Sequence, residues 1–236
     1  MIEINNLYKK FGKNEVLKGI DLSIKKGGIF AVLGPNGSGK TTLIKSILGM
    51  VIPNSGEILV NGVASKNNYK YRDKIDYLPQ IANFPENLKV KELIAMIKDL
   101  RNSKTDNDVE LIDIFKLEPF LDKKLVNLSG GTKQKVNLVL TFMFDSPIMI
   151  LDEPTNGLDP ISHLRLKELI FREKTKGKTI LVTSHILNFV EEIADEIVFL
   201  LEGKIYFKGS TSELKSQTGQ PDFEHAIASI LSSSYA

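Results

Sequence analysis

The chain has 236 residues, of which 42% are hydrophobic and 25% charged, and its formal net charge of +2 gives no sign of the strong basic field that would indicate a nucleic-acid partner. There is no cysteine, which excludes disulfides, thiolate metal sites and cysteine nucleophiles and fits a reducing compartment. No apolar run approaches the ~20 residues that span a bilayer, and residues 1–6 lack the basic start and apolar stretch of a signal peptide. We therefore expect a cytoplasmic protein whose membrane-spanning helices, if it works at a membrane, belong to another polypeptide.

The first part of the chain predicts strands around one helix. Residues 2–4 alternate, and a second strand over 16–24 ends at a glycine turn. The short apolar run 29–33 suits a buried parallel strand, and the helical segment 41–48 stops at a glycine. Residues 57–60 look like a strand that reaches a tight Asn-Gly turn.

The middle of the chain changes in character. From about Ala82, apolar residues recur at helical spacing in three segments, and the glycines that punctuate both ends of the chain are missing from 81–129. We therefore expect a helical subdomain over about 82–145, inserted into a core made of about 1–81 and 146–209.

After this insert, strand and helix alternate again. Strands are expected at 148–151, 179–183, 197–200 and 205–207, and helices at 160–174 and 187–194. Such alternation predicts an α/β fold with a mostly parallel sheet and helices on both faces. The tail, about 210–236, is polar except for one apolar patch at helical spacing, which we expect to dock on the core: Phe223, Ala226, Ile227, Ile230 and Leu231.

The loop after the 29–33 strand matches the pattern of a phosphate-binding loop, G-x-x-x-x-G-K-[ST]. Its glycines let successive N–H groups point at phosphate oxygens, and the helix that follows adds its positive dipole end. Lys40 is expected to reach the β- and γ-phosphates, and Thr41 to offer its hydroxyl to Mg²⁺. The expected nucleotide contacts are Gly34, Pro35, Asn36, Gly37, Ser38, Gly39, Lys40, Thr41 and Thr42.

Two acids, Asp152 and Glu153, end the apolar strand at 148–151 and precede a proline. Ligands of parallel sheets sit beyond the carboxyl ends of the strands, so these acids should face the phosphate loop. We expect Asp152 to hold Mg²⁺ through water and Glu153 to act as general base on the attacking water. The alternative is that the two acids have only a structural role and cap the turn that follows the strand.

Two further polar residues follow predicted strands. His185 is placed to donate to the γ-phosphate or to hold the water with Glu153, with an ordinary surface histidine as the alternative. The amide of Gln80 is placed to touch Mg²⁺ or the water, and Gln80 stands where the chain leaves the core for the helical insert. The catalytic set is therefore Glu153, His185, Lys40 and Gln80, and the metal set Thr41, Gln80 and Asp152.

The tetrapeptide Leu128-Ser129-Gly130-Gly131 has the form of a helix start, in which Ser129 is the N-cap and two glycines expose N–H groups to an anion. This is a second phosphate-binding end, in a different lobe from the first. One protomer cannot easily bring both ends to one nucleotide, so the second end is expected to serve the nucleotide of another chain. A plain N-capped helix is the alternative.

These residues in this order resemble the ATP-binding cassette (ABC) ATPases over nearly the whole chain. The loop at 34–41 resembles the Walker A motif, Gln80 the Q-loop, and 128–131 the signature. Residues 148–153 resemble Walker B, Leu158-Asp159 the D-loop, and His185 the switch histidine, and Phe11 matches the aromatic residue that stacks on adenine.

The resemblance implies a P-loop NTPase fold with an antiparallel β subdomain and an inserted helical subdomain. It also implies a head-to-tail homodimer that sandwiches two ATP molecules with Mg²⁺, each between the Walker A loop of one subunit and the signature of the other. The helical lobe would grip an integral membrane permease subunit, which places the protein at the cytoplasmic face of the cell membrane.

Two departures from the family pattern are small. The fifth signature position is Thr132 where Gln is usual, and the D-loop opens Asn156-Gly157 where Ser or Ala with Gly is commoner. Neither removes a phosphate contact or the base, so we expect competent hydrolysis. A finer resemblance is to the ATPase of the copper-processing ABC system that matures nitrous oxide reductase, and it is carried by residues 79–88, 97–101, 128–136, 142–145 and 201–204.

Other classes of protein fit the sequence less well. A soluble ABC ATPase of DNA repair would carry a long coiled coil, and one of translation would carry two cassettes, whereas this chain has one cassette and a short insert. A GTPase would need the Asn-Lys-x-Asp motif that recognises guanine, which is absent here. A small-molecule kinase would leave the signature at 128–131 unexplained. A module that binds without hydrolysing is disfavoured because Lys40, Asp152, Glu153 and His185 are all present.

Overall fold

The computed structural model describes residues 1–234, and a six-stranded sheet of order β10-β9-β3-β8-β7-β6 forms its centre. All neighbouring pairs are parallel except β9 and β10, which are antiparallel. The strands are β3 (Gly28–Leu33), β6 (Ile75–Leu78), β7 (Ile148–Asp152), β8 (Thr179–Ser184), β9 (Glu196–Leu201) and β10 (Lys204–Gly209). The inner strands β7 and β8 are buried at every residue, as expected for a sheet that is covered on both faces.

A second, antiparallel sheet of order β2-β1-β4-β5 lies beside the first. Its strands are β1 (Ile2–Phe11), β2 (Asn14–Ile24), β4 (Ser55–Val60) and β5 (Val63–Ala64). Apolar residues of α1 (Lys40–Ile47), such as Leu43 and Ile47, pack in one cluster with β1, β2, β4 and one face of the central sheet. The antiparallel sheet therefore encloses the helix that begins at the phosphate loop.

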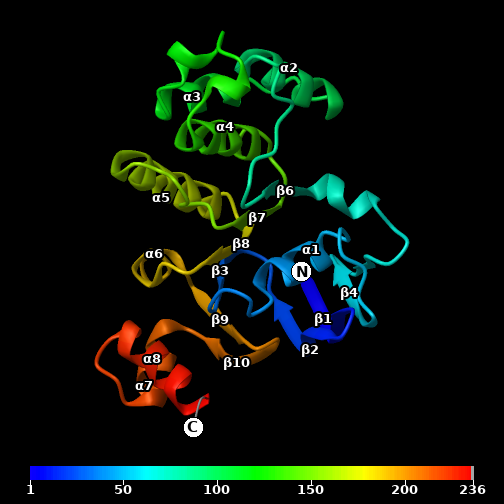
Figure 1. Cartoon of the computed structure of the whole chain (residues 1–236), viewed down its shortest axis with the longest axis vertical. Coiled ribbons are helices and arrows are strands. Elements are labelled where there is room, and N and C mark those ends of the chain that lie inside the picture. Colours follow the sequence, from blue (N-terminus) through cyan, green and yellow to red (C-terminus); the bar gives the residue numbers. More distant parts are fainter. Residues whose placement is uncertain (235–236) are drawn as a thin grey trace.

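The opposite face of the central sheet is covered by α5 (Pro160–Thr175) and α6 (Leu187–Ile193), and its hydrophobic cluster continues into the helical insert. That insert holds α2 (Val90–Leu100), α3 (Asn107–Ile114) and α4 (Gly130–Phe142), with short 3₁₀ turns at 118–120 and 125–127. A third 3₁₀ turn, at 70–74, leads into β6. Figure 1 shows α2, α3 and α4 gathered at one end of the molecule.

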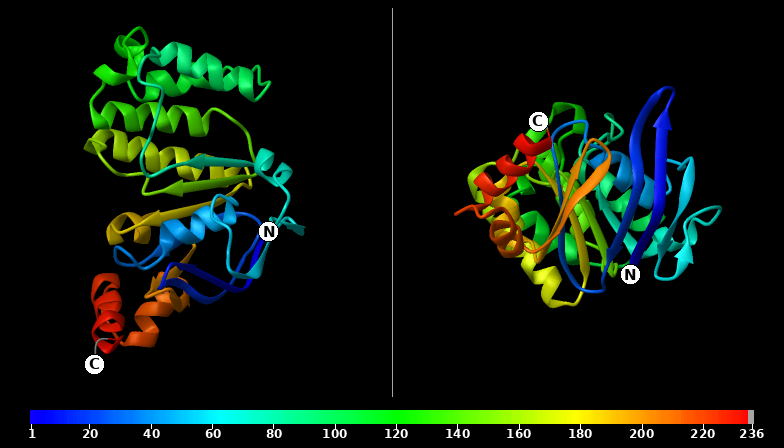
Figure 2. Two further views of the ribbon diagram at one scale, coloured as in Figure 1. Left: turned by 45° about the vertical axis from the view of Figure 1, so that its right-hand side comes forward. Right: turned by 90° about the horizontal axis from the view of Figure 1, so that it is seen from below.

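The tail forms two helices, α7 (Thr211–Thr218) and α8 (Phe223–Ser234), at the other end of the molecule (Figures 1 and 2). The predicted docking of the apolar patch is confirmed: Phe223, Ala226 and Ile227 are buried in the core cluster, and two further patch residues pack against it. Helix α7 was not predicted, because only Leu214 of its residues is buried and its apolar pattern is therefore short.

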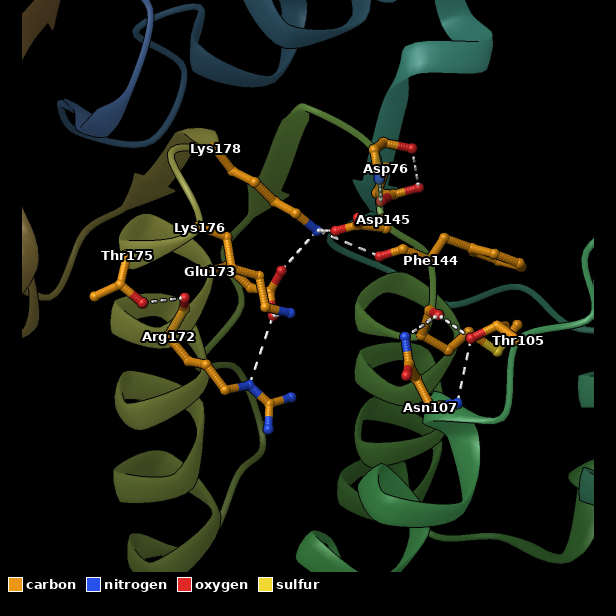
Figure 3. A network of polar contacts seen from close by, with 12 residues as sticks. Asp76, Thr105, Asn107, Phe144, Asp145, Arg172, Glu173, Thr175, Lys176 and Lys178 are labelled. Atoms are coloured by element: carbon orange, nitrogen blue, oxygen red, sulfur yellow. Dashed lines mark hydrogen bonds and ion pairs between the residues drawn. The ribbon is translucent and has the colours of Figure 1, made fainter.

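The chain returns from α4 to the central sheet through residues 143–146, which polar contacts hold at both ends (Figure 3). Thr105 and Asn107 both donate to the carbonyl of the first of these residues, each at 3.2 Å. Ser146 donates to the buried carboxylate of Asp76 through its N–H (3.1 Å) and its hydroxyl (2.8 Å). These bonds join the helical insert to β6 beside it.

A buried ion pair holds the same linker to the C-terminal part of α5 (Figure 3). Lys178 Nζ lies 2.6 Å from Glu173 Oε2 and 2.9 Å from Asp145 Oδ1, and it donates to the Phe144 carbonyl at 3.4 Å. Burial lowers the pKa of Lys178, but Glu173 and Asp145 more than offset this effect and leave the pKa raised. Lys178 therefore stays charged and links α5 to the linker.

Candidate nucleotide-binding site

The loop between β3 and α1 has a backbone that only glycine adopts without strain. Gly34, Gly37 and Gly39 have φ angles of 152°, 83° and 108°. A Cβ added to Gly34 would lie 2.0 Å from the carbonyl oxygen of Leu200, so the loop is also tightly packed against β9. No side chain caps the N-terminus of α1, which leaves its first N–H groups available to an anion.

The ammonium group of Lys40 is folded back over this loop. Its Nζ donates to the carbonyl oxygens of Gly34 (2.7 Å) and Pro35 (3.2 Å). Burial lowers the pKa of Lys40, and the nearby carboxylates of Glu153 and Asp152 oppose that shift. The cation lies over the concave side of the loop, between the loop carbonyls and two acids, which is where phosphate oxygens would meet it.

Asp152 is the last residue of β7 and is 1% exposed. Its Oδ1 accepts a hydrogen bond from Thr183, whereas its Oδ2 has no hydrogen-bond partner among residues 1–234, and the same is true of the buried Ser38 hydroxyl. Burial, and to a smaller extent the negative charge of Glu153, raise the pKa of Asp152. Hydrogen bonding to the side chains of Thr183 and Thr41 opposes this rise but does not cancel it. A buried carboxylate oxygen without a partner fits a hard divalent cation with its water ligands.

Glu153 follows in a left-handed backbone conformation, with φ of 51°. Its N–H donates to both the carbonyl (3.1 Å) and the hydroxyl (3.0 Å) of Thr183, which fixes this unusual turn. Its Oε2 lies 2.7 Å from His185 Nδ1, and the histidine side chain is 54% exposed while that of Glu153 is 4% exposed. A buried carboxylate thus meets an exposed imidazole at the edge where β7 and β8 end.

The structure places the other predicted residues as follows. Gln80 lies two residues beyond β6, at the same edge of the sheet, and within residues 1–234 its side chain makes no hydrogen bond. Phe11 ends β1 and is half exposed, with Lys9 Nζ 4.7 Å from the centre of its ring. A Cβ on Gly39 would contact Val16 of β2, so the strand paired with β1 reaches the phosphate loop.

The signature residues lie at the start of α4, away from this cluster. Ser129 is the N-cap, and its Oγ accepts the N–H of Thr132 at 3.3 Å. Instead of reaching the phosphate loop, this end of α4 contacts the segment that follows Glu153. A Cβ on Gly131 would lie 2.5 Å from the carbonyl oxygen of Gly157.

Two neighbouring side chains strengthen this contact. Gln134 donates to the Pro154 carbonyl at 3.0 Å, and Lys135 Nζ lies 2.7 Å from Asp159 Oδ2. The pKa of Asp159 is well below its usual range, chiefly because of Lys135 and then because of the N–H of Ser162. The signature and the segment 153–159 of one chain therefore form a single unit.

Thr183, Gln134 and Lys135 were not among the predicted site residues. Thr183 and Ser184 are polar residues at the carboxyl end of β8, after its apolar run, and this is a signal for Thr183 because such positions face ligands. Gln134 and Lys135 lie among the polar residues that open α4, and their sequence pattern does not separate an internal brace from an exposed surface.

Comparison with known proteins decides the class. The sequence model of a family described as "ABC transporter" matches residues 17–156, more than half of the chain. The chain belongs to the ABC transporter family. It is 34% identical over 207 residues to the lantibiotic transport ATP-binding protein SrtF of Streptococcus pyogenes, a match that covers 87% of this chain and 89% of SrtF.

Other similar proteins agree with this assignment. The linearmycin resistance ATP-binding protein LnrL of Bacillus subtilis (strain 168) is 34% identical over 224 residues, which are 93% of this chain and 72% of LnrL. A solved ATP-binding subunit of an ABC transporter superposes with a TM-score of 0.88 at 30% identity and covers 97% of this chain and 98% of its own. A dimeric cassette, MJ0796 in a post-hydrolysis state bound to ADP and Pi, superposes with a TM-score of 0.80 at 25% identity and covers 89% of this chain and 98% of its own.

The chain is thus the nucleotide-binding subunit of an ABC transporter, an ATPase with the α/β fold of that family, as the sequence predicts. The GTPase and small-molecule kinase alternatives are replaced by this assignment. Across residues 1–234 there is no helix with the length and apolar character that crossing a membrane requires.

Proposed function

We propose that two copies of this chain pair head to tail, so that the phosphate loop of one copy and Ser129–Gly131 of the other hold the same ATP. One observation carries the proposal: the signature contacts the segment after Glu153 of its own chain and makes no hydrogen bond to residues 34–41 within the described chain. Both phosphate-binding ends are then used only if a second copy completes each site. The dimeric cassettes among the similar structures support this arrangement.

The chemistry follows from the positions of the side chains. The N–H groups of 34–41 and the Lys40 ammonium would take the phosphates, with Lys40 exchanging the loop carbonyls for the β- and γ-phosphate oxygens. Thr41, Asp152 and Gln80 would hold Mg²⁺, which when bound neutralises phosphate charge. Thr42 would add a phosphate contact, and the exposed ring of Phe11 would stack on adenine.

Glu153 is then the general base. Its carboxylate accepts the proton of a water that attacks the γ-phosphorus, while the bond to the leaving ADP breaks. His185 holds the Glu153 carboxylate at Oε2 and presents its other ring nitrogen to solvent and to the incoming phosphate. The backbone turn at Glu153, which Thr183 fixes, holds this carboxylate at the edge of the sheet where β7 and β8 end.

The proposed membrane permease subunit would dock in a groove of about 610 Å³ between β6 and α2. Apolar side chains line it, and two of them, Ile81 and Leu100, are 70% and 72% exposed. Ile81 follows Gln80 directly, so a segment in this groove touches the chain next to the proposed metal site. Arg101 closes one end of the groove, 2.6 Å from the buried Asp76 and over the ring of Phe144.

Such docking would place the protein at the cytoplasmic face of a membrane. The named relatives act in lantibiotic transport and linearmycin resistance, which favours an export system as the partner. The finer likeness to the copper-processing ATPase stays a prediction. Capture of the permease from detergent-solubilised membranes with the tagged chain, and its sequencing, tests both the partner and the substrate class.

The two-chain site is tested by Ser129→Arg, which brings bulk and positive charge to the proposed interface. We expect loss of steady-state ATP hydrolysis, while ATP binding to the monomer is unchanged within about twofold, because the phosphate loop is untouched. Ser216→Arg on the exposed face of α7 is the matched control and should keep full turnover. Weak ATP binding by the Ser129→Arg monomer would overturn the two-chain assignment.

A mixing experiment adds a positive readout. Lys40→Met and Ser129→Arg should each be inactive alone, but a mixed dimer of the two contains one site with a normal lysine and a normal signature. Single-turnover phosphate release should therefore reappear when the two variants are mixed. If both motifs served the nucleotide of their own chain, mixing would restore nothing.

A further inference from the structure

The N-terminus of α4 carries a contact between two hydroxyl groups, those of Ser129 and Thr132, that the proposed mechanism has not used. Ser129 Oγ accepts the backbone N–H of Thr132 at 3.3 Å and lies 2.9 Å from Thr132 Oγ1. Thr132 occupies the signature position at which the resembling family usually has Gln. The residue that departs from the family pattern is thus in direct contact with the serine that the two-chain site depends on.

The hydrogen-bonding capacity of Ser129 decides what this contact can do. A hydroxyl has one proton to donate and two lone pairs to accept with. One lone pair of Ser129 is taken by the Thr132 N–H. If Ser129 donated its proton to Thr132, it would have no proton left for a phosphate oxygen. If Thr132 donates instead, both lone pairs of Ser129 are filled and its proton is free.

The surroundings leave the approach over Gly130 open. Ser129 and Gly130 are exposed, and a Cβ on Gly130 would meet nothing within 4 Å, whereas the side of Gly131 is closed by Gly157. An anion can therefore approach over Gly130, where it meets the helix N–H groups and the Ser129 hydroxyl together. An acceptor that carries negative charge favours the arrangement in which Ser129 is the donor.

We propose that Thr132 is a positioning residue that donates its hydroxyl proton to Ser129 and so directs the Ser129 proton toward the γ-phosphate of the partner's ATP. This inference rests on the proposed two-chain site and deepens it. The Thr132 hydroxyl touches no nucleotide itself. Its effect is confined to the step at which two chains close on ATP, because the monomer binds nucleotide at the phosphate loop alone.

The test compares Thr132→Val, Thr132→Ala and Thr132→Ser. Val keeps the branched shape and the backbone N–H of the cap but lacks the hydroxyl, Ala lacks the hydroxyl with a smaller side chain, and Ser keeps it. Each is made in the Glu153→Gln background, where slow hydrolysis preserves the ATP-bound dimer for analytical ultracentrifugation. Each is also made in the wild-type background, for kcat and KM. Monomer binding is measured with ATP at protein concentrations below dimerisation.

We expect Val and Ala to weaken ATP-induced dimerisation and to lower kcat by about two- to twelvefold, the range of one hydrogen bond, with monomer ATP affinity unchanged. Ser should restore both quantities to within about twofold of Thr. Dimerisation and kcat that are unchanged in Val and Ala would overturn the proposal. So would a Ser variant as impaired as Val, because the methyl group and not the hydroxyl would then matter.

Failure of this inference is distinguishable from failure of the two-chain site. If Ser129→Arg in the Glu153→Gln background still dimerises with ATP, the two-chain site itself is wrong. If Ser129→Arg blocks dimerisation while Thr132→Val and Thr132→Ala behave as wild type, only the role of Thr132 is wrong. Equal melting temperatures of the three Thr132 variants confirm that the helix cap is intact.

Discussion

His185 Nδ1 lies 2.7 Å from Oε2 of Glu153, so the residues that directly follow β8 and β7 meet in one hydrogen bond. The carboxylate is buried and is fixed through its backbone by Thr183, whereas the imidazole is half exposed. The proposed base is therefore rigid, and its partner is the group that can respond to a nucleotide. Removal of the imidazole frees the carboxylate without emptying the core.

We expect His185→Ala to lower kcat for ATP hydrolysis by about 10²-fold, in the range of a lost acid–base or positioning group, with little change in ATP affinity. His225→Ala is the matched control, because this exposed imidazole of α8 pairs with the exposed Asp222, away from the nucleotide site, and the variant should keep wild-type kcat. Phosphate-release assays and equilibrium ATP binding measure both quantities. A His185→Ala kcat within twofold of wild type would contradict this role.

Gly131→Ala tests the contact between the signature and the segment after Glu153. The added Cβ would lie 2.5 Å from the Gly157 carbonyl oxygen, so the backbone at one of these two positions must shift. We expect a loss of about 1–3 kcal/mol in the free energy of unfolding, as for other overpacked sites. Urea unfolding of the nucleotide-free protein measures it.

Gly130→Ala provides the control for the same chemical change one residue earlier. Its Cβ would meet no atom within 4 Å, and alanine is the better helix former, so stability should be unchanged or rise by up to about 1 kcal/mol. Equal losses in the two variants would show that the packing against Gly157 is not what makes Gly131 necessary.

The parts of the site that the sequence predicted are those in which a short motif carries its own geometry. The glycine pattern at 34–41 requires positive φ angles, and the acids at 152 and 153 follow an apolar strand, so the order of residues along the chain is enough to locate both. The capping box of Ser210 with Glu213 offered a comparable local signal for α7, although a polar tail obscured it. Such local patterns can be predicted from the sequence because the residues involved lie in the same helix, strand or loop.

Contacts between distant segments were not predictable in this way. Gly131 meets Gly157, and Thr183 bonds both Asp152 and Glu153, because strands and helices far apart in sequence come together in the fold. Glu173 and Lys178 read as ordinary charged residues of a helix end, yet both are almost fully buried. A single sequence gives the residue type at such positions but not the partner.

Lys178→Met tests that buried pair. It leaves Glu173 buried with only its peripheral partners Lys176 and Arg172, and we expect the free energy of unfolding to fall by about 3 kcal/mol, as when one member of a buried pair is lost. Lys116→Met is the matched control, since both Lys116 and its partner Asp113 are exposed and the free energy of unfolding should be almost unchanged.

The double variant Glu173→Leu with Lys178→Met separates the cost of an unpaired charge from the loss of an attraction. In the double variant the buried carboxylate of Glu173 is gone, so no unpaired charge is left in the interior. The double variant should therefore be more stable than Lys178→Met alone. Urea unfolding of all three variants is the measurement. A double variant that is less stable than the single one would mean that Glu173 stabilises the fold even without Lys178, through Lys176 and Arg172.

Asp152→Asn should stabilise the nucleotide-free, Mg²⁺-free protein at pH 7, because the native carboxylate is buried with one oxygen unpartnered. Burial raises the pKa of Asp152, so as the pH rises the unfolded chain releases this proton first and the free energy of unfolding falls. The asparagine side chain of the variant cannot ionise, and its amide oxygen still accepts the hydrogen bond from Thr183.

The expected gain is about 1 kcal/mol at neutral pH, and it should shrink as the pH approaches ~4, where an unfolded aspartate is itself protonated. Asp122→Asn is a control of opposite sign, because Lys91 and Lys89 lower the pKa of the exposed Asp122, so this variant should bring no gain at pH 7. Urea unfolding between pH 4 and 8 measures both. If Asp152→Asn were destabilising throughout this range, the buried carboxylate would be stabilising the fold. Burial would then carry no cost that a bound cation offsets, and the proposed metal role of Asp152 would lose its physical basis.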